Sequence, residues 1–279
     1  MGCAWQAYLN LLPVGIRQDI DRLGRDKLQE LRLRIQMPPE LITSQGSIWL
    51  QNITTKDDIS FCINAATRYS PWAAGTISEG YVTALGGHRI GVCGDAVRTN
   101  DGMTGISKAT SLCLRVARDF PGIAEKAAGL KGSILILGRP GSGKTTLLRD
   151  LIRRKSESGE RIAVVDERGE LFPQTQDGMC FPPGRRTDVL RGCAKASGIE
   201  MVLRNMSPTI IAVDEITAQA DCDALIHAGW CGVQFLATAH ASGKADLLRR
   251  PVYKPIVTSA LFEWLLILQP DKSWILERF

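Results

Sequence analysis

The sequence contains no closely spaced pair of cysteines and few histidines. Its 8 cysteines never form a C-x-x-C pair, and its 3 histidines do not stand beside them. Zinc sites and small disulfide frameworks both depend on such spacing. We therefore expect neither kind of site, and we interpret the cysteines as the reduced thiols of a cytosolic protein.

Long apolar runs are also missing. The longest runs, around Ile134 and over residues 264–268, are far shorter than the roughly 20 residues that a membrane-spanning helix needs. Residues 1–6 lack the basic region and apolar core of a secretory signal, and they lack the serine or threonine that N-myristoylation requires. The sequence predicts no direct membrane insertion, so any membrane role would come through a partner protein.

Aromatic residues are few as well, and basic residues outnumber acidic ones only slightly. Aromatic residues make up 6% of the chain, and 34 basic against 29 acidic residues give a net charge of +5. A channel for single-stranded nucleic acid would combine a basic groove with aromatic side chains. No nucleic-acid partner is therefore expected. The remaining composition, 44% hydrophobic over 279 residues, suits one large or two medium globular domains.

Residues 1–120 mix helical and strand patterns, which predicts a small α+β domain. Helical patterns cover residues 13–23, 55–69 and 71–79, and strand patterns cover 28–35, 41–42, 48–50, 81–85, 88–93 and 112–118. Thr55 and Asp58 resemble a capping box at the start of the second helix. A turn is predicted over residues 99–102, and residues 119–122 are typical of a linker.

Residues 121–279 alternate strands and helices, which predicts an α/β domain with a parallel-rich, doubly wound sheet. The predicted strands are residues 134–137, 162–166, 210–214 and 234–238, followed by a hairpin of 263–269 and 273–278. We therefore expect two domains, 1–120 and 121–279.

Between the first strand and the helix after it lies a match to the P-loop pattern G-x-x-x-x-G-K-[ST]. Its residues are Gly138, Arg139, Pro140, Gly141, Ser142, Gly143, Lys144, Thr145 and Thr146. Glycines let the backbone N–H groups and the helix N-terminus approach a triphosphate closely. Lys144 would then reach the β- and γ-phosphates of ATP, and the Thr145 hydroxyl would hold Mg²⁺. ATP and Mg²⁺ are the expected ligands.

Two strands end in carboxylates, at the edge where doubly wound sheets bind ligands. Asp214 and Glu215 follow one apolar strand, so Asp214 would hold the Mg²⁺ hydration shell and Glu215 would polarise the attacking water. Asp166 and Glu167 end the other, which makes Glu167 a second candidate for ordering water. A solvated loop with an Asp–Arg pair is the open alternative for this second pair.

Histidine and arginine supply further candidates. His240 ends the fourth strand, where a side chain can sense the γ-phosphate, whereas His88 and His227 are assigned no role. Arg185 and Arg186 lie in a predicted loop over residues 182–188. They would serve as arginine fingers for a neighbouring subunit, with solvated surface as the alternative.

Together these motifs resemble the type II and type IV secretion and pilus motor ATPases. The resemblance is carried by the P-loop, by Val-Asp-Glu-Arg at 165–168, by residues 204–216 and by Leu-Ala-Thr-Ala-His at 236–240. Residues 86–92 and 184–196 look like a sporulation branch of that superfamily. The resemblance covers most of the chain and is strongest from 133 to 242.

The resemblance implies a hexameric cytoplasmic motor with a RecA-like ATPase domain, and nucleotide between that domain and the N-terminal one. Its implied partners are integral membrane proteins of a channel between mother cell and forespore. By position, Lys144 and Thr145 belong to the phosphate loop, Glu167 to an acidic box, Asp214-Glu215 to the second P-loop motif and His240 to a histidine box. Arg115 and Arg118 fall where the relatives' N-domain arginines approach the nucleotide.

Some positions depart from that superfamily. Asp214-Glu215 stands where secretion motors usually have Gly-Glu, the acidic box reads Asp-Glu, and Thr217 replaces an arginine. The main catalytic base is therefore either Glu215 or Glu167. Two other functions stay open: a RecA-like nucleic-acid-dependent ATPase, and an ATP-dependent switch or scaffold with low turnover.

Overall fold

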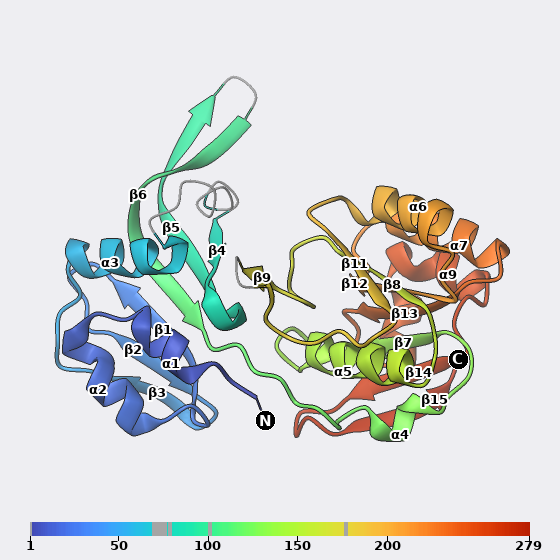
Figure 1. Cartoon of the computed structure of the whole chain (residues 1–279), viewed down its shortest axis with the longest axis horizontal. Coiled ribbons are helices and arrows are strands. Elements are labelled where there is room, and N and C mark those ends of the chain that lie inside the picture. The colour runs from blue at the N-terminus through green and yellow to red at the C-terminus, as the bar shows by residue number, and fades with distance from the viewer. Residues whose placement is uncertain (1, 69–76, 78–79, 100–101, 176–177) are drawn as a thin grey trace. The chain divides into compact units, whose positions relative to one another are not determined.

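The computed structural model describes residues 2–68, 77, 80–99, 102–175 and 178–279. The helix predicted over residues 71–79 and the turn predicted over 99–102 lie largely outside these residues. Contacts group the chain into two units, both drawn in Figure 1. The first comprises Met1–Asp119 and Pro173–Cys180, and the second comprises Phe120–Phe172 and Phe181–Phe279.

A six-stranded antiparallel sheet forms the first unit, in the order β3-β2-β1-β6-β5-β4. Its strands are β1 (Leu28–Arg34), β2 (Glu40–Thr43), β3 (Gly46–Trp49), β4 (Tyr81–Thr83), β5 (Arg89–Thr99) and β6 (Gly102–Arg115), with the 3₁₀ turn η2 (Leu85–Gly87) between β4 and β5. Helices α1 (Trp5–Asn10), α2 (Val14–Leu23) and α3 (Lys56–Thr67) pack on one face of this sheet (Figure 1). The short strands β9 (Gln174–Thr175) and β10 (Gly178–Met179) pair with each other and are grouped with this unit.

Alternation along β1 explains which face the helices cover. Leu31 and Leu33 are buried, whereas Arg32 between them is exposed. Successive strand residues point to opposite faces, so the two leucines join a core that includes Tyr8 of α1 and Ile59 of α3.

The start of α3 confirms the predicted capping box. The N–H of Asp58 donates to Oγ1 of Thr55 (3.1 Å), and the N–H of Thr55 donates to the Asp58 carboxylate (2.8 Å). These bonds satisfy backbone donors that the first helical turn leaves without a partner.

A seven-stranded sheet forms the second unit, in the order β11-β8-β12-β13-β7-β14-β15, and β15 alone in this sheet runs antiparallel to its neighbour. The strands are β7 (Ile134–Leu137), β8 (Ile162–Asp166), β11 (Thr187–Arg191), β12 (Ile210–Glu215), β13 (Gln234–Ala239), β14 (Trp264–Leu268) and β15 (Trp274–Arg278). The helices are α4 (Glu125–Ala128), α5 (Lys144–Glu157), α6 (Lys195–Met206), α7 (Gln219–Trp230), α8 (Lys244–Arg249) and α9 (Lys254–Thr258), with η3 (Pro251–Tyr253) before α9. This topology confirms the predicted parallel-rich α/β class.

Helices cover both faces of the second sheet. Leu135 and Leu137 of β7 join a core cluster with α6 and α7. Ile134 and Ile136 alternate with them, and α5 lies against β7, β8, β12 and β13 on their side. None of the described helices is long and apolar enough to cross a membrane.

Because six strands of the sheet run parallel, their carboxyl ends meet at one edge of the sheet, and the candidate site lies there.

Candidate active site

The P-loop connects the end of β7 to the start of α5 and has the backbone that its glycines allow. Gly141 (φ 74°) and Gly143 (φ 106°) take left-handed conformations, and Gly143 is the N-cap of α5. A Cβ at Gly138 would lie 2.4 Å from Oγ of Ser142 and 3.2 Å from Cβ of Leu268, so a larger residue there would force these side chains to move. Glycine at these three positions lets the loop close over the helix N-terminus, where backbone N–H groups attract anions.

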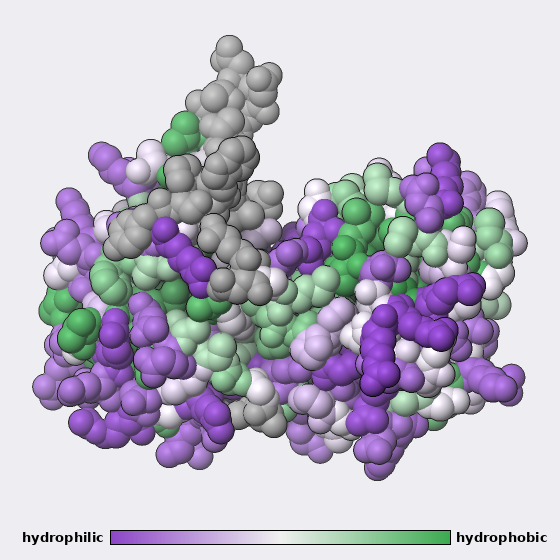
Figure 2. Space-filling view, viewed as in Figure 1, coloured by the Kyte–Doolittle hydropathy of each residue, from purple (hydrophilic) through white to green (hydrophobic). Residues whose placement is uncertain are grey.

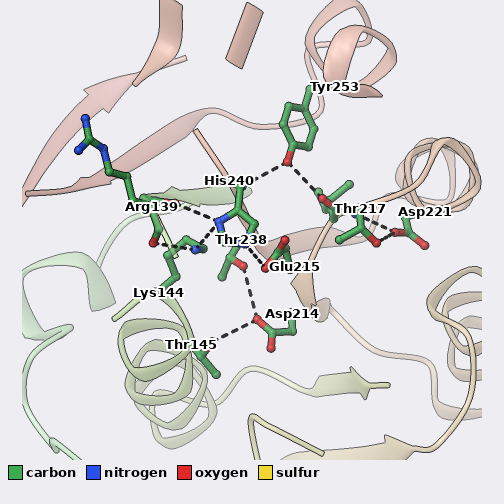
Figure 3. A network of polar contacts seen from close by, with 12 residues as sticks. Arg139, Lys144, Thr145, Asp214, Glu215, Thr217, Asp221, Thr238, His240 and Tyr253 are labelled. Carbon is green, nitrogen blue, oxygen red and sulfur yellow. Dashed lines mark hydrogen bonds and ion pairs between the residues drawn. The ribbon is translucent and has the colours of Figure 1, made fainter. Parts of the chain in front are cut away.

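Lys144, the first residue of α5, turns its amino group toward the neighbouring strand tip (Figure 3). Its Nζ donates to the carbonyl of Arg139 (3.2 Å) and lies 2.9 Å from Nδ1 of His240. Burial lowers the pKa of Lys144, and the charges of Glu215 and Asp214 oppose that shift. An ammonium group can only donate, so Nδ1 accepts and the proton of a neutral His240 ring lies on Nε2.

His240 connects Lys144 to Glu215. Its Nε2 lies 2.5 Å from Oε2 of Glu215, which accepts the ring proton. The backbone of His240 is fixed as well, because its N–H donates to the hydroxyl of Tyr253 (3.2 Å), which in turn donates to the carbonyl of Ile216 (3.3 Å). Figure 3 shows this chain of contacts from Lys144 through His240 to Glu215. The structure therefore brings three predicted site residues together.

Asp214 occupies a bulge in β12. The pairing with β13 joins Val213 to Ala237 and then Glu215 to Thr238, so Asp214 is the extra residue between them. The hydroxyls of Thr145 (3.5 Å) and Thr238 (3.4 Å) both approach Oδ1 of Asp214, at the outer limit of hydrogen bonding. The bulge thus aims the carboxylate at the P-loop threonine.

The surroundings of Asp214 favour its neutral form. Burial raises its pKa to about 6, the charges of Asp166 and Glu215 add to that rise, and the charges of Lys144 and Lys195 oppose it. A divalent cation at this point would reverse the balance, because a positive charge favours the ionised carboxylate.

The Thr145 hydroxyl and the Asp214 carboxylate suit Mg²⁺. Both are hard oxygen donors, and Mg²⁺ is usually held by one or two protein oxygens together with substrate phosphates and water. Within the part of the chain that the structure describes, no group of three or more His, Cys, Asp or Glu side chains could hold a metal ion. The donor set therefore fits a cation shared with a bound phosphate chain rather than an all-protein site.

The second acidic tip, at the end of β8, is differently engaged. The carboxylate of Asp166 is buried and accepts the N–H groups of Glu170 and Phe172, both at 2.9 Å. Burial raises its pKa, and the backbone N–H groups of Phe172 and Leu171 oppose the rise. Glu167 is paired with Nζ of Lys195, the first residue of α6. The Asp166 carboxylate thus holds the loop that follows β8. Glu167 lies at the predicted edge of the sheet, but its carboxylate is paired with the Lys195 ammonium group.

Arg185 and Arg186 lie at the other edge of the sheet. Arg185 is 88% exposed and pairs with Glu157 (3.4 Å), while Nη1 of Arg186 donates to the carbonyl of Gly159 (2.9 Å). The carbonyl of Arg186 also accepts the N–H of Ile162, at the amino end of β8. The structure does not bring these arginines to the P-loop of their own chain, and a role toward a neighbouring subunit stays a prediction.

Arg115 and Arg118 belong to the first unit and have partners within it. Nε of Arg115 lies 3.1 Å from the Glu30 carboxylate. The Arg118 guanidinium donates to the backbone carbonyls of Arg25 and Leu28. Their approach to a nucleotide stays a prediction.

Two side chains at the site were not predicted from the sequence. Tyr253 comes from η3, which no motif marks, and only the fold brings it to His240. Lys195 falls inside residues 184–196, but the spacing to Glu167 gives no sign of the pair. A basic residue at the amino end of a helix is electrostatically unfavourable, and that signal could have drawn attention to Lys195.

A family model described as "Sporulation stage III, protein AA" matches residues 5–274. The chain belongs to the sporulation stage III protein AA family. Within this family it is 35% identical to "Stage III sporulation protein AA" of Bacillus subtilis (strain 168), over 94% of this chain and 90% of that one. It is also 30% identical to "Uncharacterized protein ycf45" of Cyanidium caldarium, over 60% of this chain and 52% of that one.

Solved structures show that this family member has the fold of secretion and pilus motor ATPases. The pilus retraction motor PilT with bound ADP has a TM-score of 0.63 at 16% identity, covering 94% of this chain and 80% of that one. The Legionella pneumophila ATPase DotB has a TM-score of 0.57 at 16% identity, covering 96% and 80%. The predicted fold, a RecA-like ATPase domain preceded by a smaller α+β part, is confirmed.

Proposed function

We propose that this member of the sporulation stage III protein AA family is a Mg²⁺-dependent ATPase. It acts as a hexameric motor that energises the assembly or operation of a membrane channel from mother cell to forespore. The observation that carries the proposal is the contact chain from Lys144 through His240 to Glu215, with steps of 2.9 and 2.5 Å. It joins the group that would bind phosphate to the group that would order water.

Binding would begin at the P-loop. The N-terminus of α5 and its backbone N–H groups attract the phosphates, and Lys144 moves from His240 to the β- and γ-phosphate oxygens. Oγ of Ser142, buried and without a partner among the described residues, is available to the same oxygens. Thr145 and Asp214 would hold Mg²⁺, which neutralises charge on the phosphate chain when bound.

Hydrolysis needs an oriented water molecule, and Glu215 is the group that we assign to it. Its carboxylate accepts a proton from the water as the water oxygen attacks the γ-phosphorus, the bond from that phosphorus to the β–γ bridging oxygen breaks, and ADP and inorganic phosphate leave. The Nε2 proton of His240 holds that carboxylate in place, while Tyr253 holds the His240 backbone. Glu167 is less suited because Lys195 already occupies its carboxylate.

His240 would sense the γ-phosphate. Its Nδ1 accepts from Lys144 without nucleotide and loses that donor when Lys144 turns to the phosphates. A ligand can shift an equilibrium only through contacts that differ between two states, and this exchange is such a difference. We propose that it moves two domains, residues 1–120 and 121–279, against each other.

Ring assembly would use surfaces away from the P-loop. Figure 2 shows hydrophobic surface over the part of the second unit that contains α6, and this helix exposes Met201 and Met206. Trp230, at the end of α7, is 77% exposed. Exposed apolar patches of this kind often mark protein contacts. In the ring, Arg185 and Arg186 would reach a neighbour's phosphates, and Arg115 and Arg118 would approach the nucleotide. The motor would be cytoplasmic and would meet the membrane through channel proteins.

The test combines turnover with mass. Wild type should hydrolyse MgATP, and Glu215→Gln should bind ATP but turn it over about 100-fold more slowly, since orienting and deprotonating water is worth about that much or more. Light scattering of Glu215→Gln should show a hexamer-sized particle with MgATP. A monomer with ATP bound and no turnover in wild type would instead favour a switch. Stimulation by single-stranded nucleic acid would favour the nucleic-acid-dependent class.

A further inference from the structure

A cavity of about 700 Å³ adjoins the P-loop within the second unit. Gly143 and Thr146 form one wall, Phe120 and Ile123 form a second, and Leu268 and Trp274 of the β14–β15 hairpin form a third. We propose that this cavity is the base subsite for a purine nucleotide, and that the indole ring of Trp274 is the surface on which the base stacks. The inference rests on the proposed function, because the phosphates of the same nucleotide would occupy the P-loop.

Continuity with the P-loop identifies the occupant. Gly143 is the N-cap of α5, and Thr146 follows the threonine that would hold Mg²⁺, so both belong to the anion-binding turn and also line the cavity. A phosphate chain seated on that turn would direct the rest of its nucleotide into this space. The size lies within the 300–1,000 Å³ typical of ligand pockets, and Lys272 and Ser273 supply polar groups.

The second wall is fixed to α5 before any ligand arrives. The N–H groups of Gly122 and Ala124 both donate to Oδ2 of Asp150, at 3.0 and 2.9 Å, and Asp150 is buried. One turn further along α5, Nζ of Lys155 donates to the carbonyl of Leu130. A preformed wall lowers the cost of ordering that binding would otherwise carry.

Trp274 is held in one orientation. Its Nε1–H donates to the carbonyl of Ile123 (3.3 Å), which ties the third wall to the second. An indole has no other hydrogen-bonding group, so the ring contributes only apolar aromatic surface to the cavity lining. Flat heteroaromatic bases stack on such surfaces, and a purine covers more of the ring than a pyrimidine.

The hairpin also supplies a matched control. Trp264 lies on β14, the partner strand of β15, and its Nε1–H donates to the carbonyl of Lys131 (2.8 Å). Both indoles therefore tie the same hairpin to the same segment before β7. Trp264 does not line the cavity, so its replacement should cost packing without removing a stacking surface.

The experiment compares a ligand that carries a nucleobase with a ligand that has none. Calorimetry on the full chain, with Mg²⁺, measures the affinity for the non-hydrolysable analogue AMP-PNP and for inorganic tripolyphosphate. Trp274→Ala should weaken AMP-PNP binding about 5- to 150-fold, which corresponds to about 1–3 kcal/mol of stacking, and should leave tripolyphosphate within about twofold. Trp264→Ala should change neither affinity, and Trp274→Phe, which keeps a ring, should retain most of the AMP-PNP affinity.

Other results overturn the inference. Equal losses for AMP-PNP and tripolyphosphate in Trp274→Ala, or no loss for AMP-PNP, would remove the base from this cavity. Wild type settles the point without any variant: equal affinity for the two ligands, or CTP competing with AMP-PNP as well as ATP does, contradicts a purine subsite. If wild type binds neither AMP-PNP nor tripolyphosphate, the proposed ATPase function itself fails.

Discussion

Nζ of Lys144 lies 2.9 Å from Nδ1 of His240, so the P-loop cation is held by a histidine from a different strand. The opposite nitrogen of the ring contacts Glu215 at 2.5 Å. A single imidazole therefore contacts both the proposed phosphate-binding group and the proposed base. If a bound phosphate drew Lys144 away, Nδ1 of His240 would lose its donor while Nε2 kept its contact with Glu215. The proposed role as a phosphate sensor requires this behaviour.

Replacing His240 should slow turnover more than it weakens ATP binding. His240→Ala removes the donor to Glu215, and a hydrogen bond to a charged group is worth about 1.5–3 kcal/mol, so kcat should fall about 10- to 100-fold. Affinity for AMP-PNP should change little or rise, because Lys144 loses a competing partner. Steady-state hydrolysis and calorimetry measure the two effects. The control is His227→Ala, an exposed histidine on α7, and an equal loss of kcat in both variants would remove the assigned role.

Replacing Asp214 should stabilise the protein while impairing Mg²⁺-dependent hydrolysis. Its pKa is about 6 when folded and near 4 when unfolded, so between these pH values the folded protein binds more protons. The free energy of unfolding therefore falls as pH rises through this window and stays lower above it. Asp214→Asn should raise the free energy of unfolding by about 1–3 kcal/mol at pH 7.

Urea unfolding of the nucleotide-free protein measures that gain. Asn keeps an oxygen that can accept from Thr145 and Thr238, so the comparison isolates the charge. The gain should shrink to a few tenths of a kcal/mol near pH 4 and disappear below about pH 3, where aspartate is neutral in both states. A gain of the same size at both pH values would show that the charge is not its cause.

Much of the second unit could be predicted because its strands are buried on both faces. Such strands are continuous apolar runs, and the predicted limits of Ile134–Leu137 and Ile162–Asp166 match β7 and β8. The predicted loop over residues 182–188 was wrong at its end, since β11 begins at Thr187. This strand is mostly half-buried and lies at the sheet edge, so its parallel pairing with β8 defines it rather than its composition.

The first unit was harder to predict where pairing is long-range. The hairpin predicted over residues 81–93 is part of a longer antiparallel arrangement. Strand β5 extends to Thr99 and pairs with β6, which begins at Gly102, and their pairing contains three register shifts. Such shifts break the strict alternation that marks a strand. Helix α1 is six residues long, too short for a periodic pattern to show.

At the site, sequence motifs predicted which groups gather but not how they pair. The P-loop and the two acidic tips follow from local patterns. The partner of each carboxylate does not: Glu215 meets a histidine from β13, and Glu167 meets the first residue of α6. Those contacts depend on how strands and helices pack, which spacing along the chain does not encode.

The Lys195–Glu167 pair offers a test of which glutamate is the base. The Lys195 side chain is 9% exposed and the Glu167 side chain is 39% exposed, so Lys195→Met leaves a partly solvated carboxylate without its cation and should lower the free energy of unfolding by about 1 kcal/mol. The double variant Lys195→Met with Glu167→Gln should recover part of that loss, because no charge is left unpaired. It should also keep hydrolysis within about tenfold of wild type, since Glu215 is untouched. Urea unfolding and steady-state hydrolysis measure both quantities, and a double variant as inactive as Glu215→Gln would make Glu167 the base.

His88 should make the first unit sensitive to mild acid. Its Nδ1 accepts the N–H of Ala117 and its Nε2–H donates to the carbonyl of Ala4, both at 3.0 Å, while burial lowers its pKa to about 4. The unfolded chain takes up a proton near pH 6.5 and the folded one does not, so stability is fully present above pH 6.5 and is lost as pH falls toward 4, by up to about 3 kcal/mol. Hydrogen exchange of β6 amides in the full chain isolates this unit from Asp214, whose effect has the opposite sign. His88→Gln should be less stable at pH 7 and should flatten the acid dependence, whereas His227→Gln should change neither; an unchanged slope in His88→Gln would show that another group is responsible.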